Sequence, residues 1–245
     1  MKKERIQLID TIRGLVLFSM ILYHASWNLV YIYGVSWPWF HSKAAYIWQQ
    51  SICWTFIFLS GFCFPLAKRH LKSGCLVFSA GIVVTLATLI VMPENRVVFG
   101  VLTCIGSCIL LAAMGEKWLR MFPTKGGLLL SFVLFICTKH INAGTLGLGN
   151  IVCMALPKEW YCNYVTTFLG FPFPKFFSTD YFSLMPWCFL FMTGFYSSLL
   201  CEKKELFRFS VWRKTIPVLD FAGRHSLIIY LLHQPLIYAI QESIF

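Results

Sequence analysis

The sequence contains few charged residues, and acidic residues are the rarest of them. Asp, Glu, Lys and Arg make up 13% of the 245 residues, and only ten of those residues are acidic. A water-soluble protein of this length cannot cover a chain that is 58% hydrophobic, because its surface needs more polar side chains. The scarcity of charge therefore indicates an integral membrane protein.

The chain also lacks the patterns of metal sites, β-barrels and secreted precursors. None of its ten cysteines stands in a CxxC pair, so we predict no metal site. The apolar segments do not alternate with polar residues as barrel strands do. No cleavage pattern follows the first apolar run, which we expect to remain as a span. We interpret the cysteines as buried thiols, and whether Cys153 and Cys162 pair stays open.

The basic residues outnumber the acidic ones, which gives a formal net charge of +11. Most of them lie in short loops between apolar runs, where they set topology and meet anionic lipid. We therefore expect the lipid bilayer, and no nucleic acid, as the partner of this charge.

The fold class predicted is an all-α polytopic membrane protein with one domain over residues 1–245. A span needs about 20 apolar residues, and the chain has seven candidate segments, of which the fifth is short, with an eighth left open. The segments lie near residues 11–33, 46–66, 74–92, 97–114, 126–140, 182–201 and 219–241. The long outer loop 141–181, rich in Gly, Pro and aromatic residues, is of a length that often carries function.

The distribution of Lys and Arg predicts the orientation of the chain. Fourteen of these residues, beginning with Lys2, Lys3 and Arg5, fall on the side of the N-terminus, and five fall on the opposite side. The positive-inside rule therefore places the N-terminus in the cytoplasm. With seven spans, the C-terminus lies outside.

The first predicted span carries polar residues that lipid does not favour. Arg13 and His24 are eleven residues apart, so they share one helical face about 16 Å apart along the axis. Asp10 and Asn28 fall near the same stripe, which we expect to face a protein interior or a wet cavity. Taken singly, Arg13 is also compatible with a snorkelling anchor paired with Asp10, and His24 with a hydrogen-bonded core histidine.

The last predicted span repeats this pattern. Ser226, Tyr230 and His233 are spaced by four and three residues and share one helical face. The alternative is a hydrogen-bond ladder between helices, which polar residues in membrane bundles commonly form. Arg224 and His225 precede this face at the cytoplasmic mouth, where they are candidates for contact with phosphate.

Two further candidates lie on the outer side. Asp180 stands just before the sixth span, as a helix cap, a general base or a substrate anchor. His41 precedes the second span. Both positions are accessible to an acceptor that arrives from outside.

Five segments in order resemble one family of transmembrane acyltransferases. They are RIQLIDTIRGLVLFSMILYH, IFLSGFCF, NRVVFGVLTCIG, STDYFSLMPWCFLFMTGFY and FAGRHSLIIYLLHQP. The first resembles the Arg and His signature of acyltransferase family three. The set as a whole is similar to bacterial proteins grouped with heparan-α-glucosaminide N-acetyltransferase. The resemblance covers nearly the whole chain, although Thr103 and Ser183 depart from the family pattern.

The resemblance implies an enzyme of a bacterial cytoplasmic membrane that moves an acetyl group from cytoplasmic acetyl-CoA to an outer acceptor. The expected acceptor is an amino sugar or another glycan. A histidine is implicated in catalysis in the family. His24 matches the Arg and His spacing, whereas His41 best matches the histidine of the lysosomal enzyme. Two residues therefore compete for that role, and we expect His24 first and His41 second.

The residues expected to act fall into three groups. We expect acetyl-CoA to meet Asp10, Arg13, Arg224, His225, Ser226, Tyr230 and His233. We expect His24, His41 and Asp180 in catalysis, and Asn28 and Asp180 at the acceptor. N- or O-acetylation, direct transfer or an acetyl-histidine intermediate, and a homodimer all stay open.

Two function classes compete with this interpretation. Intramembrane His, Arg and Asp are also what a small proton-coupled transporter or channel needs, although no inverted repeat is visible. A noncatalytic assembly partner in the membrane would use the same polar groups for packing alone.

Overall fold

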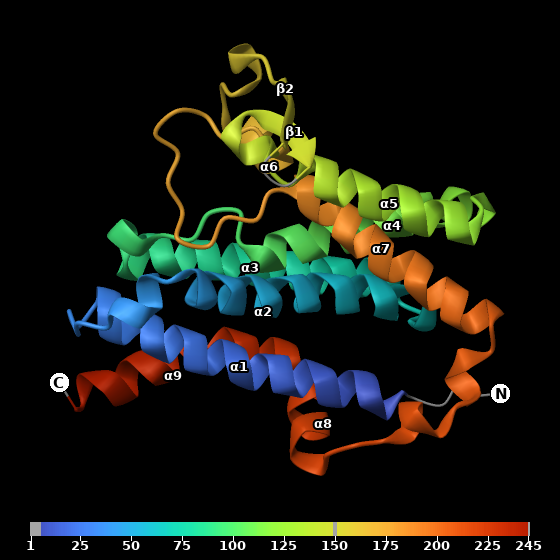
Figure 1. Ribbon diagram of the computed structural model, residues 1–245. Coiled ribbons are helices and arrows are strands. Elements are labelled where there is room, and N and C mark those ends of the chain that lie inside the picture. Colours follow the sequence, from blue (N-terminus) through green and yellow to red (C-terminus); the bar gives the residue numbers. More distant parts are fainter. Residues whose placement is uncertain (1–5, 149–150, 245) are drawn as a thin grey trace. The chain divides into compact units, whose positions relative to one another are not determined.

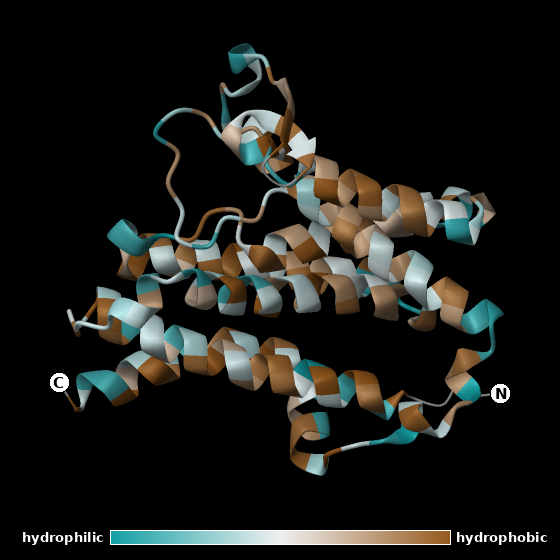
Figure 2. Cartoon of the chain, viewed as in Figure 1, coloured by the Kyte–Doolittle hydropathy of each residue, from teal (hydrophilic) through white to brown (hydrophobic). Residues whose placement is uncertain are grey.

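Helices make up most of the chain, as Figure 1 shows. The computed structural model describes residues 6–148 and 151–244. Within that part of the chain, six helices are long and apolar enough to cross a membrane, which confirms the all-α multi-pass fold. Hydrophobic residues cover most of these helices (Figure 2). The N-terminal Lys2, Lys3 and Arg5, used above to orient the chain, lie outside the described residues.

The elements follow one another in a simple order. The candidate spans contain α1 (Gln7–Tyr31), α2 (Lys43–Cys63), α3 (His70–Val91), α4 (Val101–Met121), α5 (Thr124–Thr138) and α7 (Leu184–Lys203). The span that begins with α5 continues through a 3₁₀ turn to Ala143. The shorter elements are β1 (Thr145–Leu148), β2 (Ile151–Ala155), α6 (Tyr164–Leu169), α8 (Pro217–Arg224) and α9 (Ser226–Glu242). Within lipid, a helix satisfies its own backbone hydrogen bonds, which explains why the apolar segments take this form.

The helices gather into two compact units. Unit 1 comprises Met1–Phe56 and Glu205–Phe245, and unit 2 comprises Ile57–Lys204. Helix α2 passes from the first unit into the second. The candidate residues of the first and last predicted spans therefore belong to unit 1, and Asp180 belongs to unit 2.

Unit 1 is built around helix α1. The buried side chains of Leu17, Met20 and Ile52 form a small apolar cluster, against which residues of α8 and α9 pack. The indole Nε1 of Trp48 donates a hydrogen bond to Ser19 Oγ over 2.8 Å, which ties α2 to α1. This packing fixes one face of α1 toward α8 and α9.

The closest approach in unit 1 is between α1 and α8. A Cβ atom on Gly14 would lie 1.9 Å from the carbonyl oxygen of Leu219, and one on Gly223 would lie 1.9 Å from that of Asp10. Real atoms never come that close, so only glycine fits at either position. The two backbones are therefore in direct contact.

The seventh predicted span is not one helix. The segment 219–241 divides between α8, which ends at Arg224, and α9, which begins at Ser226. His225, between them, has φ −104° and ψ 20°, outside the helical region. Helix α9 has 17 residues, or about 25 Å, which is shorter than the ~30 Å hydrocarbon layer. The predicted span 219–241 therefore contains a helix break at His225, and its crossing of the membrane stays a prediction.

In unit 2, helix α4 begins later than the predicted boundary at residue 97. The backbone of residues 96–99 is instead hydrogen-bonded to residues 178–182: Thr179 N donates to Arg96 O, and Phe182 N to Phe99 O. Ser178 Oγ accepts from Val98 N over 2.9 Å. These bonds hold the two segments together before α4 and α7 start.

The outer loop 141–181 contains more structure than the sequence predicted. Strands β1 and β2 pair antiparallel, and α6 follows with a capping box formed by Asn163 and Thr166. Asn142 Nδ2 donates to the carbonyl oxygen of Gly170 and to Ser183 Oγ, each over 2.9 Å. Cys153 and Cys162 are free thiols in this segment.

The contact between α1 and α8 leads to a first prediction. We expect Gly14→Ala and Gly223→Ala each to lower the free energy of unfolding by about 1–3 kcal/mol, because the added methyl group forces the two backbones apart. Thermal unfolding of the purified protein, followed by tryptophan fluorescence, measures the change.

Gly115→Ala is the matched control. No heavy atom lies within 4 Å of a Cβ built at Gly115, so we expect this variant to keep the stability or to gain about 0.5–1 kcal/mol from helix propensity. Equal midpoints for Gly14→Ala and Gly115→Ala would contradict the close contact.

Candidate functional site

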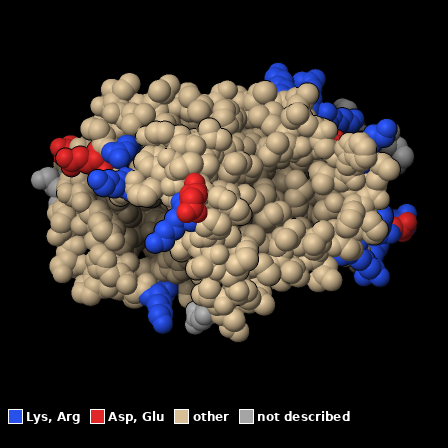
Figure 3. All heavy atoms as spheres, turned by 90° about the horizontal axis from the view of Figure 1, so that it is seen from above, with Lys and Arg blue, Asp and Glu red and all other residues tan. Residues whose placement is uncertain are grey.

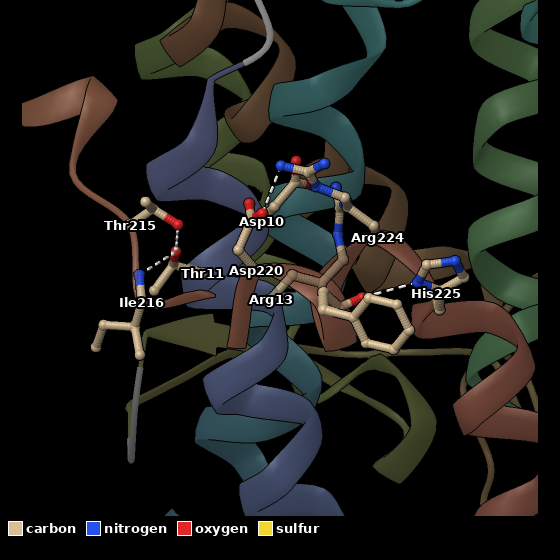
Figure 4. Close-up of polar contacts among 9 residues, drawn as sticks. Asp10, Thr11, Arg13, Thr215, Ile216, Asp220, Arg224 and His225 are labelled. Atoms are coloured by element: carbon tan, nitrogen blue, oxygen red, sulfur yellow. Dashed lines mark hydrogen bonds and ion pairs between the residues drawn. The ribbon is translucent and has the colours of Figure 1, made fainter. Parts of the chain in front are cut away.

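Four charged side chains gather where α8 crosses α1 (Figure 4). Arg13 Nη1 bonds Asp10 Oδ1 over 3.1 Å, and Arg224 Nη2 bonds Asp220 Oδ2 over 2.5 Å. The two aspartates are almost buried, whereas the side chains of Arg13 and Arg224 are 21% and 41% exposed. The two carboxylates are thus buried inside the cluster, whereas both arginine side chains are partly exposed.

The carboxylate of Asp220 has an unusual feature. Its Oδ1 atom is buried and has no hydrogen-bond partner among the described residues. A buried acceptor without a donor costs free energy. The packing of the cluster therefore buries Asp220 Oδ1 without a hydrogen-bond donor among the described residues.

The neighbours of this cluster divide into two kinds. Thr11 Oγ1 lies 3.4 Å from Thr215 Oγ1, which ties α1 to the segment before α8. His225 Nδ1 lies 2.9 Å from the carbonyl oxygen of Phe221, and its ring stacks on that residue. His225 thus points away from the four charges in Figure 4. Ser226 is the first residue of α9.

Further along α1, His24 meets the last helix. Its ring centroid lies 4.8 Å from that of His233 in α9, and the ring of Tyr230 lies 5.3 Å from His233. The structure thus brings together the histidines that the sequence placed on two separate spans. His24 lies about 16 Å along α1 from Arg13.

The hydrogen bonding of His233 defines which ring nitrogen is basic. Its Nδ1 lies 2.5 Å from the carbonyl oxygen of Tyr230. A carbonyl oxygen only accepts, so Nδ1 carries the proton of the neutral ring. Its Nε2 is buried without a hydrogen-bond partner in the described part of the chain. The lone pair of Nε2 is therefore free to accept a hydrogen bond or a proton.

Asn28 is fully engaged in a network of side-chain amides. Its Nδ2 donates to Gln241 Oε1 over 3.0 Å, and its Oδ1 accepts from Gln234 Nε2 over 2.8 Å. Gln241 Nε2 donates in turn to the carbonyl oxygen of Ala25. The network joins α1 to α9 and fixes which residues of the two helices face each other.

His41 lies apart from the histidine pair in sequence and in setting. It ends a short turn of 3₁₀ helix, Pro38–His41, and is exposed. Its Nδ1 lies 3.4 Å from the hydroxyl of Tyr31, at the end of α1. This histidine is therefore accessible near the C-terminal end of α1.

Asp180, in unit 2, caps a helix other than the one it precedes. Its Oδ2 accepts a hydrogen bond from Val101 N, the first residue of α4, over 3.2 Å. Burial raises the pKa of this carboxyl to about 6, and the bond from Val101 opposes that rise. The neutral acid is thus favoured up to a mildly acidic pH.

Sequence reasoning missed three residues of unit 1. Asp220 stands four residues before Arg224, a spacing that signals an ion pair on one helix face. Gln234 and Gln241 are seven residues apart in an apolar segment, which signals one polar face. The sequence shows both spacings, but it does not show which residues of α1 these side chains meet.

The described residues contain no group of three or more His, Cys, Asp or Glu side chains that could hold a metal ion. The donor chemistry of unit 1 consists instead of arginines, carboxylates, imidazoles and amides. Arginine binds phosphate oxygens through a planar fork, and an imidazole accepts or donates a proton near neutral pH. The arrangement can therefore hold an anion at one place and move a proton at another.

Comparison with known families identifies a relationship over almost the whole chain. The family described as "Heparan-alpha-glucosaminide N-acetyltransferase, catalytic" matches residues 5–235. Searches of curated proteins and of solved structures found no match. The matched range includes both clusters of unit 1 and Asp180.

The raised pKa of Asp180 leads to a second prediction. Because the folded protein holds this proton more tightly than the unfolded chain, the stabilisation is complete below about pH 4 and is lost as the pH rises through 6. We expect the free energy of unfolding to fall by up to about 2 kcal/mol over that range, and Asp180→Asn to remove this fall. Unfolding midpoints at pH 4–7 measure it.

Glu94→Gln provides the control, since Glu94 is an exposed carboxylate in the same unit. This variant should keep the pH dependence of the parent protein. A parallel pH profile for Asp180→Asn and the parent would contradict the assignment.

Proposed function

Since the chain belongs to the heparan-alpha-glucosaminide N-acetyltransferase catalytic-domain family, we propose that it takes an acetyl group from acetyl-CoA on the cytoplasmic side of a bacterial membrane. The acceptor is an amino sugar or another glycan reached from the outer side. The observation that supports this most is the pair of clusters on one face of α1. A long, thin donor with charge at one end and a reactive group at the other fits that arrangement.

The charged cluster is the proposed site for the phosphates of coenzyme A. The side chains of Arg13 and Arg224 are partly exposed there. Each guanidinium can bind a phosphate through two parallel N–H bonds. Asp10 and Asp220 hold the stems of the arginines in place through the ion pairs. His225 and Ser226 stand next to this site in the chain.

The histidine pair is the proposed reaction centre. The Nε2 lone pair of His233, or the imidazole of His24, removes a proton from the acceptor amine or hydroxyl. The acceptor atom then forms a bond with the thioester carbonyl carbon. The carbon–sulfur bond breaks, and the sulfur leaves with the electron pair and takes up a proton as free coenzyme A. Tyr230, whose ring lies 5.3 Å from that of His233, is the proposed group that polarises the thioester carbonyl.

A second route through the same pair uses a covalent intermediate. A ring nitrogen of His24 attacks the thioester carbonyl carbon, the carbon–sulfur bond breaks, and coenzyme A leaves with the electron pair and takes up a proton. The acceptor then gives up a proton and bonds to the acetyl carbon, as the bond from that carbon to His24 breaks. His41 is the alternative catalytic histidine, at the outer end of the unit. Asn28 is already hydrogen-bonded to two amides, so we assign it to positioning α9 rather than to the acceptor. A contact of Asp180 with the acceptor and a homodimer stay predictions.

Loss of activity in two variants tests the proposal. We expect His24→Ala to reduce the acetylation of glucosamine about 10²–10⁴-fold, as removal of a general base does. We expect Arg13→Lys to raise KM for acetyl-CoA roughly tenfold or more with a smaller effect on kcat, because the bidentate phosphate contact is lost. Purified protein in nanodiscs with labelled acetyl-CoA gives both values.

His140→Ala and Arg96→Lys are the matched controls, since both residues belong to unit 2 and neither is assigned to the site. They should keep the parent kinetics. Turnover of acetyl-CoA that is unchanged in His24→Ala and in His41→Ala would overturn the assignment of the reaction centre. Proton flux in proteoliposomes, without any acetyl-CoA turnover by the folded parent protein, would favour the transporter.

A further inference from the structure

Unit 2 carries an apolar groove that the proposed reaction does not use. The groove lies between the end of α4, the start of α5 and α7, and has a volume of about 280 Å³. Its lining includes Trp118, Phe122, Leu130, Leu134, Phe189 and Met192. Pockets for drug-sized molecules usually start near this volume, so the groove suits a slender ligand.

The floor of the groove is specifically built. The ring of Tyr196 lies directly over Gly127, where a Cβ would come within 2.4 Å of the ring. The hydroxyl of Tyr196 donates to the carbonyl oxygen of Leu119 over 3.2 Å. Thr193 Oγ1 donates to Ser131 Oγ over 3.2 Å. The polar atoms of the floor are therefore bonded within the protein, and the groove presents carbon to its ligand.

The groove opens toward the outside of the helices that form it. The side chains on its rim are strongly exposed: Trp118 by 74%, Leu130 by 49% and Phe122 by 46%. All three belong to helices or turns of the candidate spans α4 and α5. In a membrane such side chains meet hydrocarbon rather than water. The ligand that reaches the groove from the side is therefore a lipid chain.

The end of the groove is positively charged. The stretch from residue 116 to 125, around the turn between α4 and α5, holds three basic residues, Lys117, Arg120 and Lys125, and one acidic residue, Glu116. Glu116 pairs with Arg120 over 2.8 Å. Lys and Arg side chains gather along the right-hand edge of the face in Figure 3, and further charged side chains of both signs lie over its left half. A basic cluster at the end of an apolar groove complements an anionic headgroup on an acyl chain.

We propose that this groove binds one acyl chain of an anionic glycerophospholipid from the cytoplasmic leaflet. The headgroup phosphate lies at the turn between α4 and α5, near Lys117 and Lys125. The chain enters between α5 and α7 over Tyr196. The site is independent of the acetyl transfer assigned to unit 1.

Lipid retention tests this site directly. The purified, delipidated protein is titrated with phosphatidylglycerol or with phosphatidylcholine of the same acyl chains, and native mass spectrometry counts the lipids retained. We expect the parent to retain one phosphatidylglycerol at least tenfold more tightly than phosphatidylcholine. The double variant Lys117→Gln/Lys125→Gln should lose that preference, since each cation near an anionic headgroup contributes roughly fivefold.

A second pair of variants tests the groove itself. Leu130→Trp places an indole in the groove and should abolish retention of both lipids. Leu129→Trp changes the neighbouring residue, which is 66% exposed and does not line the groove, and should behave as the parent. Lys72→Gln removes the charge of an exposed lysine of α3 in the same unit. It controls for a general effect of positive charge on lipid retention.

Three results would overturn the proposal. They are equal retention of the two lipids by the parent, unchanged retention in Leu130→Trp, and a dimer that forms without lipid and is lost in Leu130→Trp. The dimer would show that a second copy of the chain covers the groove. Thermal unfolding of each variant verifies that it is folded, and both changed lysines and Leu130 are exposed.

Discussion

Direct contact between the backbones of α1 and α8 determines the chemistry of unit 1. With glycine at positions 14 and 223, the helices approach until carbonyl oxygens occupy the space of a side chain. This approach brings Asp10 and Arg13 beside Asp220 and Arg224. Four charges in a weakly polar setting are tolerated only when each has an opposite partner. The two ion pairs are therefore a condition of the packing, and the same packing leaves both guanidinium groups turned outward.

Further along α1, uncharged side chains fix how α1 packs against α9. Past the charged cluster, contacts between α1 and α9 are made by aromatic rings and by the amides of Asn28, Gln234 and Gln241. An amide network has directional bonds, so it permits one alignment of the helices, whereas apolar packing alone would tolerate sliding. That alignment places the ring of His233 beside His24. The position of the histidine pair thus depends on amides whose hydrogen bonds stay within the protein.

The parts of this structure that were predictable are those encoded in local periodicity. Long apolar runs gave six of the membrane helices, and the spacing of Arg13, His24 and Asn28 placed all three on the face of α1 that meets α8 and α9. The close contact of Gly14 with Leu219 was not predictable, because the two residues are far apart in the chain. The cap of α4 by Asp180 has the same origin: donor and acceptor are 79 residues apart. Strand β2 was missed because its apolar residues are exposed, so no alternation marks them.

The choice among the histidines turns on what each ring nitrogen can reach. The Arg and His spacing of the family signature favoured His24, and the position of the histidine in the lysosomal enzyme made His41 the second candidate. The structure adds His233, whose Nδ1 is fixed by a carbonyl oxygen and whose Nε2 is left buried without a partner in the described residues. A base needs an available lone pair and a ring held in one tautomer, and His233 meets both conditions. The ring of His24 lies 4.8 Å from that of His233, so we propose that these two histidines act as one pair, with His41 as the alternative.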